Sequence, residues 1–381
     1  MPEQPAIRRS ENMSFLEVKN LCKSTEQSGT VKDINFSVSK GEKIVIMSSS
    51  KKNKSMLLRL IKGLEVPDSG EILFSSGSSG SSKTEKIGMF SQDFHLFSNM
   101  NVLENLCLAP VKLLGTGRRN AERMARDRLS EAGLITKARA MPENLSEGQR
   151  QRIAICRTLM TEPEVVLFDD IENLVDPNVT SEVFAMIKML AKQELTMILS
   201  VDQIDFASEI ADRVIFISDS DGSDGKILED CKPEEFFSQP KTKEAAEFVR
   251  KLRSFNCKFD TCDFDLIALQ SSVQNFAGKY GLSKHQAYTL QICVEELVYE
   301  MLFGSCKFSE KIDLSLEVSY SSSDSSVIIA LAGKGSKFNP FEDEGEGKGD
   351  GVHLGVSMLR KIAKNIAYDF NDGTNYLTVT V

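Results

Sequence analysis

The 381-residue sequence lacks several features that assign a protein to a class at once. It has no apolar run as long as a membrane-spanning helix, so we expect no direct membrane insertion. Its 8 cysteines form no C-x-x-C pair or ladder, and nothing resembles a secretory signal, so a cytoplasmic protein with reduced thiols is expected. Acidic and basic residues are interspersed around a net charge of −9, which argues against nucleic acid as a partner.

The length of the chain and its 41% hydrophobic content favour two domains, because the chain is too long for one comfortable core. Residues 1–12 are polar and predict a disordered tail. We expect a first domain over 13–240, a helical linker over 241–256 and a second domain over 257–381.

Strand and helix patterns alternate at the start of the first domain, which predicts an α/β fold. The strand-like stretches "FLEVKNL" and "VKDINFSVSKGEKIVIM" are followed by the apolar helix "KSMLLRLIKGL" and the strand "GEILF". The tract "SSGSSGSS" then predicts a flexible hairpin loop between "EILF" and "KIGMFSQ".

Glycine is missing where a phosphate-binding loop needs it. After the strand Ile44 to Met47, "SSSKKNKS" matches G-x-x-x-x-G-K-[ST] only at Lys54 and Ser55. Ser48 and Asn53 stand at the two glycine positions, where positive φ and the close approach of phosphate favour glycine. Asn53 is the milder loss, because asparagine tolerates the left-handed region. Taken alone, such a strand-turn-helix is more often plain structure than a nucleotide site.

Downstream segments give this loop its context. "KIGMFSQDFHLFSNMNVLENL" is followed by "ENLSEGQRQRIAICRTLMTEPEVVLFDDIENLVDP" and "LTMILSVDQIDFASEIADRVIFISD". In order and spacing, the chain from Phe15 to Arg253 resembles the ATP-binding subunits of ABC transporters, most closely those for polar amino acids. The resemblance implies a P-loop ABC ATPase domain over 13–240, with ATP and Mg²⁺ as cofactors.

The resemblance also implies roles for the residues at matching positions. Lys54 and Ser55 match the Walker A lysine and its magnesium-binding hydroxyl, and Ser48 and Asn53 belong to the same cofactor-binding loop. Gln92 matches the Q-loop glutamine, which contacts Mg²⁺ and the attacking water.

Two further segments complete the implied site. Asp169 ends the Walker B strand and would hold Mg²⁺ through water, and Asp176 matches the D-loop aspartate. The signature "LSEGQ" would cap the γ-phosphate of the opposing subunit with three cofactor-binding residues, which are Ser146, Gly148 and Gln149.

The departures from the family pattern concentrate on the chemistry. Asp170 stands at the catalytic glutamate position and sets the carboxylate back by one methylene, and a misplacement of about 1 Å can cost roughly 100-fold in rate. Asp202 stands at the switch histidine position, where an ionised carboxylate repels a γ-phosphate by roughly 4 kcal/mol at about 4 Å and an effective dielectric near 20. Glu147 adds another carboxylate to the signature, and Thr25 replaces the aromatic residue expected on adenine.

A new pattern begins near Asn256. Two helices in "DLIALQSSVQNFAGKYGLSKHQAYTLQICVEELVYEMLF" precede the strands "KIDLSLEVSY" and "SSVIIALAG", a Gly- and Glu-rich loop, the helix "LGVSMLRKIAKNI" and the hairpin "AYDFNDGTNYLTVTV". This predicts a smaller α+β sandwich. It resembles the GHKL nucleotide-binding fold of histidine kinases and, in its compact size, the anti-sigma-factor serine kinases.

The helical motif of that second family is altered in this chain. In "EELVYE", Glu296 matches the general base and Glu300 stands at the asparagine that would bind Mg²⁺. Two carboxylates at i and i+4 share a helix face and repel mildly. The alternative interpretation is a solvated acidic face.

The glycine motifs of the second family are only partly kept. Gly333 replaces the adenine-reading aspartate, while Gly335 matches the D-x-G glycine. "GVHLG" keeps Gly351 and Gly355 but has His353 at the middle glycine. The resemblance therefore implies a second degraded nucleotide site.

These observations favour an ABC-type ATP-binding homologue fused to a GHKL-like domain, acting as a pseudo-ATPase or a nucleotide-modulated regulatory or binding protein. The alternatives are a slow but working ATPase subunit of an amino-acid ABC importer, and a weakened kinase of the anti-sigma type. The partners that the resemblance implies are a second ABC-type subunit, either self or an intact homologue, and a membrane permease at the inner face of the cell membrane.

Overall fold

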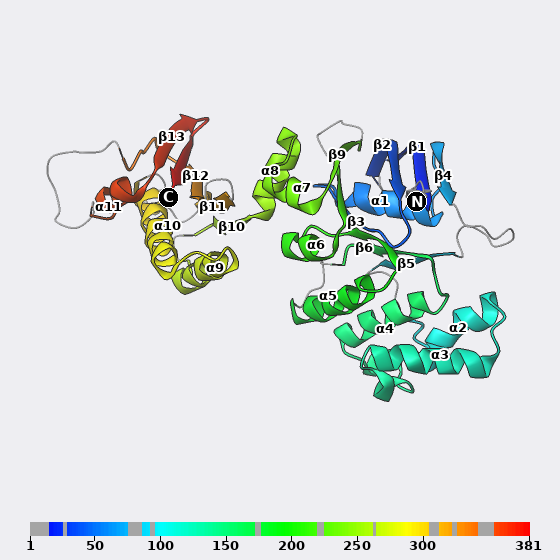
Figure 1. The fold of residues 1–381 in the computed structure, drawn as a ribbon. Helices are drawn as coiled ribbons and strands as arrows, with labels where there is room; N and C mark the ends of the chain where they lie inside the picture. The colour runs from blue at the N-terminus through cyan, green and yellow to red at the C-terminus, as the bar shows by residue number, and fades with distance from the viewer. Residues whose placement is uncertain are drawn as a thin grey trace, which may run out of the picture. The chain divides into compact units, whose positions relative to one another are not determined.

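The computed structural model describes residues 15–25, 29–74, 86–91, 96–171, 177–218, 225–261, 264–304, 312–321, 326–341 and 354–381. They belong to two compact units, Met1–Phe248 and Val249–Val381, which we describe one at a time (Figure 1). None of the described helices combines the length and the apolar character that crossing a bilayer requires.

A six-stranded sheet forms the centre of the first unit, in the order β5-β6-β7-β3-β8-β9. All neighbours pair in parallel except β8 and β9, and the parallel strands are short buried apolar runs. The strands are β3 Lys43–Met47, β5 Ile87–Ser91, β6 Val165–Asp169, β7 Thr196–Ser200, β8 Arg213–Ile217 and β9 Ile227–Cys231. The α/β character expected from the sequence is confirmed.

A three-stranded antiparallel sheet, in the order β2-β1-β4, packs beside it. Its strands are β1 Leu16–Thr25, β2 Gly29–Val38 and β4 Ser69–Phe74. Their apolar side chains share one core cluster with helix α1, Lys51–Lys62, and with β3. This core holds α1 between the two sheets, through apolar side chains from Met56 to Ile61.

The hairpin predicted across the Ser- and Gly-rich tract is wrong, because β4 and β5 lie in different sheets. β4 pairs with β1, whereas β5 pairs with β6. β5 is almost wholly buried and suits the parallel sheet, while β4 is partly exposed and suits an edge. The tract itself, 75–82, lies outside the described residues.

Helices α2, α3 and α4 pack on one another and form a helical layer at the bottom of the first unit in Figure 1. The remaining helices border the six-stranded sheet or follow it in the chain. The bounds are α2 Val102–Leu113, α3 Arg118–Glu131, α4 Glu147–Leu159, α5 Pro177–Ala191, α6 Ile204–Ile210, α7 Pro233–Ser238 and α8 Lys243–Leu252, with short 3₁₀ turns at Ile135–Lys137 and Pro142–Asn144.

The described residues of the second unit form a five-stranded antiparallel sheet, in the order β10-β11-β12-β14-β13, and three helices. The strands are β10 Ser254–Phe259, β11 Leu314–Ser321, β12 Ser326–Lys334, β13 Asn365–Asn371 and β14 Thr374–Thr380. The helices are α9 Leu266–Lys279, α10 Lys284–Gly304 and α11 Leu354–Ile362. Apolar residues of the sheet and of these helices form a single core.

Local details of the second unit test the sequence predictions. The β13–β14 hairpin is confirmed, with Asp372 and Gly373 both at positive φ, as a two-residue turn of this kind requires. The helix predicted over "LGVSMLRKIAKNI" ends earlier, at Ile362, because Asn365 already pairs with Thr380 as a strand. β10 begins at Ser254, inside the range predicted as a helical linker, since it pairs with β11.

Candidate functional site

The carboxyl ends of three parallel strands meet at one edge of the six-stranded sheet. β7 lies between β6 and β3, so the residues that follow these strands are neighbours. The loop 48–50 follows β3, Asp170 follows β6, and Asp202 lies two residues beyond β7. We call this region, with the start of α1, the phosphate edge.

The loop at the phosphate edge is short, because α1 begins at Lys51. Ser50 is the helix N-cap, and its hydroxyl oxygen accepts a 3.3 Å hydrogen bond from the Asn53 amide. The buried Ser48 hydroxyl accepts from the Ser50 amide at 3.1 Å, and the Lys54 amide donates to the Ser50 carbonyl at 3.4 Å. Three backbone N–H groups that a phosphate cradle would use are therefore bonded within the loop itself.

Asn53 has a structural role that the sequence does not reveal. It lies inside α1, so the left-handed conformation considered for it is not used. Its buried amide oxygen accepts from the Thr30 amide at 2.9 Å, and its amide nitrogen donates to the Ser218 carbonyl at 3.4 Å. Asn53 thus joins the start of α1 to β2 and to the end of β8.

Lys54 and Asp202 form a buried ion pair. The Lys54 ammonium donates to Asp202 Oδ2, and the two side chains are 3% and 19% exposed. Burial raises the pKa of the Asp202 carboxyl, and the Lys54 charge and hydrogen bond oppose that shift. Because a buried lysine needs a compensating anion, the pair satisfies Lys54 without any ligand.

Ser55 and Asp169 form the second polar contact of the phosphate edge. The Ser55 hydroxyl donates to Asp169 Oδ1 at 2.9 Å, and Asp169 is only 6% exposed. Burial raises the pKa of the Asp169 carboxyl, although the Ser55 hydrogen bond lowers it. A hydroxyl and a carboxylate side by side are the oxygen donors that Mg²⁺ prefers, so these two residues suit their predicted metal role.

The structure describes only some of the other residues predicted for this edge. Asp170 is half-buried and has a φ of 50°, which is uncommon for a residue other than glycine. Gln92 follows β5 directly, and β5 ends with Ser91 paired to Asp169. Gln92 and Asp176 lie outside the described residues.

The signature residues cap helix α4. The Ser146 hydroxyl accepts from the Gln149 amide at 3.3 Å, and Gln149 Oε1 accepts from the Ser146 amide at 3.1 Å, which is a capping box. A side chain at Gly148 would come within 2.7 Å of the Glu182 carboxylate on α5. The signature spacing therefore also has a structural explanation in the capping of α4 and its packing on α5.

Glu147 is held on its own helix turn. Its carboxylate accepts hydrogen bonds from the Arg150 guanidinium and, at 2.8 Å, from the Gln151 side chain. Arg150 also donates to the Leu145 carbonyl at 3.1 Å. The Arg150 guanidinium therefore partly neutralises the negative charge that Glu147 adds to the signature, and both side chains are exposed to solvent.

The phosphate edge fits Mg²⁺ better than it fits a triphosphate. Ser55 and Asp169 lie together, as a metal site needs. The lysine that would reach the terminal phosphates is occupied by Asp202, and no loop residue from Ser48 to Asn53 has positive φ. As the structure stands, the residues present do not fit Mg²⁺-ATP.

In the second unit, the predicted residues are spread over α10, the segment after β12 and α11. Glu296 is half-buried and Glu300 is 7% exposed, so the interpretation as a solvated acidic face fails for Glu300. Gly335 donates its amide to the Gly373 carbonyl at 3.0 Å. Gly355 lies in the first turn of α11, and Gly351 lies outside the described residues.

A buried asparagine that sequence reasoning missed organises the segment after β12. The Asn375 side chain is fully buried and accepts hydrogen bonds from the Phe338 amide at 2.9 Å and the Tyr368 hydroxyl at 2.7 Å. It also donates to the carbonyls of Gly333 and Ser336. An asparagine inside an otherwise alternating strand is the only sequence signal for this role.

A ring fills the space beside the end of α10. A side-chain carbon at Gly304 would lie 2.2 Å from the Phe338 ring, so the ring packs directly on the helix backbone. Phe338 also packs against the core of the second unit. This contact joins the end of α10 to the segment after β12.

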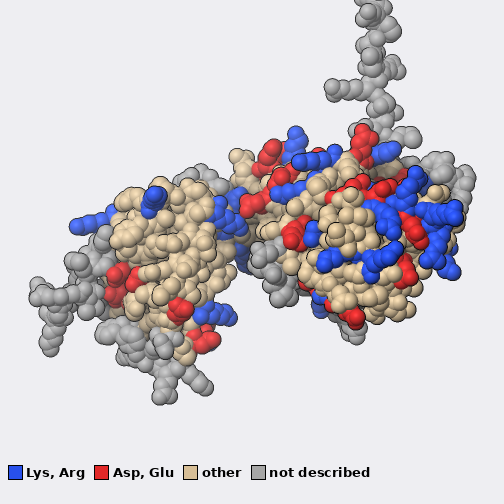
Figure 2. Space-filling view, turned by 90° about the horizontal axis from the view of Figure 1, so that it is seen from below, with Lys and Arg blue, Asp and Glu red and all other residues tan. Residues whose placement is uncertain are grey.

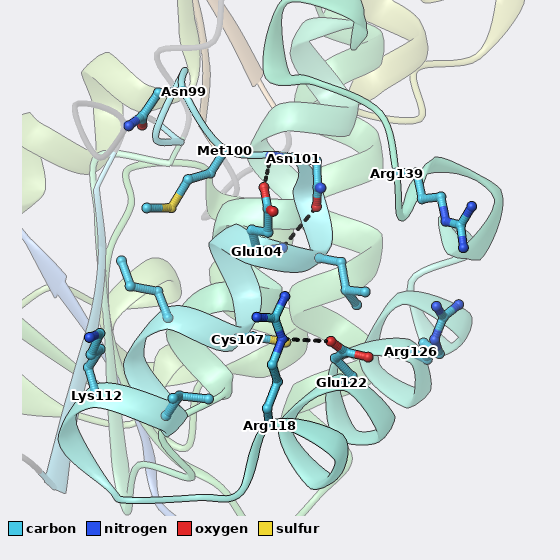
Figure 3. Close-up of a pocket in the computed structure, with 13 residues that line it drawn as sticks. Asn99, Met100, Asn101, Glu104, Cys107, Lys112, Arg118, Glu122, Arg126 and Arg139 are labelled. Carbon is cyan, nitrogen blue, oxygen red and sulfur yellow. Dashed lines mark hydrogen bonds and ion pairs between the residues drawn. The ribbon is translucent and has the colours of Figure 1, made fainter.

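The helical layer of the first unit contains a cavity of about 810 Å³ (Figure 3). Arg118 is paired with Glu122 at 3.1 Å, and Cys107 lies near the pair. In the described part of the chain, its other lining cations form no ion pair; they are Lys112, Arg126 and Arg139. Figure 2 shows the face of the first unit that carries this layer, with basic side chains prominent on it.

Comparison with known proteins identifies the first unit. Residues 31–173 match the family model described as ABC transporter. The chain is 24% identical to CbiO1 of Clostridium perfringens, a part of the ABC transporter complex CbiONQ, with a TM-score of 0.51 over 62% of this chain and 95% of that one. The structural likeness shows that the fold is that of a P-loop ABC ATPase.

Relatives of known role are more similar in sequence. The glutamine transport ATP-binding protein GlnQ of Bacillus subtilis is 39% identical over 244 residues, which are 62% of this chain and 99% of that protein. The arginine transport ATP-binding protein ArtM of the same organism is 36% identical over 244 residues, 62% of this chain and 100% of ArtM. The chain therefore belongs to the ABC transporter ATP-binding proteins.

Proposed function

We propose that the chain is an ABC-type ATP-binding homologue that acts as a pseudo-ATPase, as a regulatory or binding module rather than an efficient motor. The observation that carries this proposal is the buried Lys54–Asp202 ion pair. It removes the lysine that in this family contacts the terminal phosphates. Asp170, in place of the catalytic glutamate, would lower turnover further.

The second unit also supports the proposed regulatory role. We propose that it is a GHKL-like domain, because its single antiparallel sheet and its paired helices α9 and α10 occur in the order that this fold requires. Its predicted site departs from the family pattern at Glu300 and Gly333. We therefore expect no phosphoryl transfer from this unit.

The partners that we propose are a second ABC-type subunit and a membrane permease. Support comes from the similarity to GlnQ and ArtM, whose names describe transport, and from CbiO1, which is part of a transporter complex. The large cavity of the helical layer, with its basic lining, offers a surface for an acidic segment of such a partner. This arrangement would place the chain at the inner face of the cell membrane.

A slow ATPase subunit of an amino-acid importer is the second candidate. The observation that favours it is the 39% identity to a glutamine transport ATP-binding protein along nearly its whole length. The retained Ser55–Asp169 contact is also consistent with metal-assisted hydrolysis. The two candidates differ in whether Lys54 is available to nucleotide.

The discriminating experiment measures ATP binding and turnover of the purified full-length chain, its Lys54→Ala variant and a Lys52→Ala control. Lys52 is an exposed lysine of the same helix turn, whereas Lys54 is buried. We expect turnover at background in all three proteins. Robust turnover that Lys54→Ala abolishes and Lys52→Ala leaves intact would overturn the pseudo-ATPase proposal and establish the importer candidate.

A further inference from the structure

We propose that Asp202 is a built-in ligand of the phosphate site, which takes the place of a nucleotide's terminal phosphate on Lys54 and excludes nucleoside triphosphates. The inference rests on the proposed function, because both concern the phosphate edge. It goes further by naming the group that closes the site and the kind of ligand that this group excludes.

The sheet topology brings the two charges together. β3 and β7 are parallel neighbours, with Ile46 opposite Ser200. Lys54 lies in the first turns of α1, which follows β3, and Asp202 lies two residues beyond the end of β7. The carboxylate therefore comes from the same sheet edge at which a bound phosphate would lie in a fold of this type.

The backbone N–H groups of the loop, like the Lys54 ammonium, donate their hydrogen bonds to other groups of the chain. Ser48 Oγ and Ser50 Oγ accept hydrogen bonds from the amides of Ser50 and Asn53. In a working loop, phosphate oxygens accept from backbone amides of this kind. The chain thus supplies both replacements for a phosphate, a carboxylate for its charge and hydroxyl oxygens for its acceptors.

Displacement of this internal ligand is costly for a triphosphate. Asp202 is tethered beside Lys54, so it competes at a high effective concentration. A phosphate that reached Lys54 would leave the Asp202 carboxylate next to a like charge in a largely buried place. The loss of glycine weakens the cradle, whereas Asp202 actively opposes the ligand.

The test replaces the carboxylate and measures anion binding by calorimetry, with ATP, ADP and pyrophosphate as probes. We expect Asp202→Asn and Asp202→His to bind ATP and pyrophosphate at least roughly tenfold more tightly than the natural chain, which is about 1.4 kcal/mol. Asp205→Asn removes the same charge from an exposed position three residues away and is expected to change nothing. The gain should disappear in the double variant Lys54→Met/Asp202→Asn.

A second measurement, thermal unfolding, covers the case in which a variant folds poorly. We expect Lys54→Met and Asp202→Asn each to leave a buried partner charge and to lower the melting temperature, while the double variant recovers most of the loss. Simple addition of the two losses would overturn the inference. So would folded Asp202 variants with the nucleotide affinity of the natural chain.

These outcomes separate the inference from the proposed function. Robust ATP turnover by the natural chain defeats the proposed function, whatever the Asp202 variants do. Unchanged affinity in folded Asp202→Asn and Asp202→His defeats the inference alone, because the chain would still be a pseudo-ATPase with another cause.

Discussion

The phosphate edge of the first unit and the segment after β12 in the second unit are both held by internal contacts, but these contacts are of different kinds. At the phosphate edge, charged and hydroxylic side chains remain and bond to one another, as in the pairs Lys54–Asp202 and Ser55–Asp169. After β12, a buried amide and an aromatic ring fill the space. The contacts of the phosphate edge join charged and hydroxylic groups, whereas Phe338 after β12 packs against the apolar core of the second unit.

The largest expected effect in this comparison comes from the Asn375 amide. Asn375→Ala removes four hydrogen bonds and leaves buried groups without partners, so we expect a loss of roughly 2–5 kcal/mol of stability. Urea unfolding followed by circular dichroism measures it. Asn371→Ala, at an exposed position of the adjoining strand, is the matched control and should cost little. Equal losses in the two variants would contradict the role of Asn375.

The contact between Gly304 and the Phe338 ring gives the next effect. Gly304→Ala forces the ring to move, and we expect a cost of about 1–3 kcal/mol. Gly278→Ala is the control, because nothing lies within 4 Å of its added carbon in α9 and alanine favours the helix by about 0.5–1 kcal/mol. Opposite signs in thermal unfolding are expected. A loss that persists in full when Phe338→Ala is added would exclude the ring as the cause.

The smallest expected effect concerns the buried Asp169 carboxyl of the phosphate edge. Burial raises the pKa of Asp169, so the folded chain binds a proton at this carboxyl more tightly than the unfolded chain does. The stability that this proton contributes is present at low pH and is lost as pH rises through the folded pKa. Asp169→Asn should therefore raise the melting temperature at neutral pH, and the gain should shrink as pH falls toward about 4, the usual aspartate pKa. Thermal scans across this range test the sign. A lower melting temperature for the variant at neutral pH would contradict it.

Much of the scaffold could be predicted from the sequence, because short apolar runs and 3.6-residue periodicity are local signals. The resemblance also implied that Ser55 and Asp169 serve one Mg²⁺, and the structure places them together, with Ser55 in α1 and Asp169 at the end of β6. The pairing of Asp202 with Lys54 could not be predicted from the sequence. From the sequence, the Asp202 carboxylate is expected to repel phosphate, and sequence spacing does not show that Lys54 lies within its reach.

The second unit was harder to predict for a related physical reason. The roles of Asn375 and Phe338 arise from pairs that are far apart in the sequence, and neither residue belongs to a motif. The predicted hairpin across 75–82 is wrong for the same reason, because β4 and β5 follow one another in the chain but pair with strands of different sheets. Long-range partners decide these features, and a single sequence carries no direct record of them.

Asn53 sets a condition on any attempt to rebuild an active ATPase from this chain. Its side chain joins the start of α1 to Thr30 and Ser218, and a side chain at Gly29 would come within 3 Å of the Lys52 backbone. Asn53→Gly would restore one of the two motif glycines but cut both links at once. A designer would have to re-anchor the start of β2 before the loop could regain its glycines, so revival of the activity is a problem of the neighbouring sheet as much as of the loop.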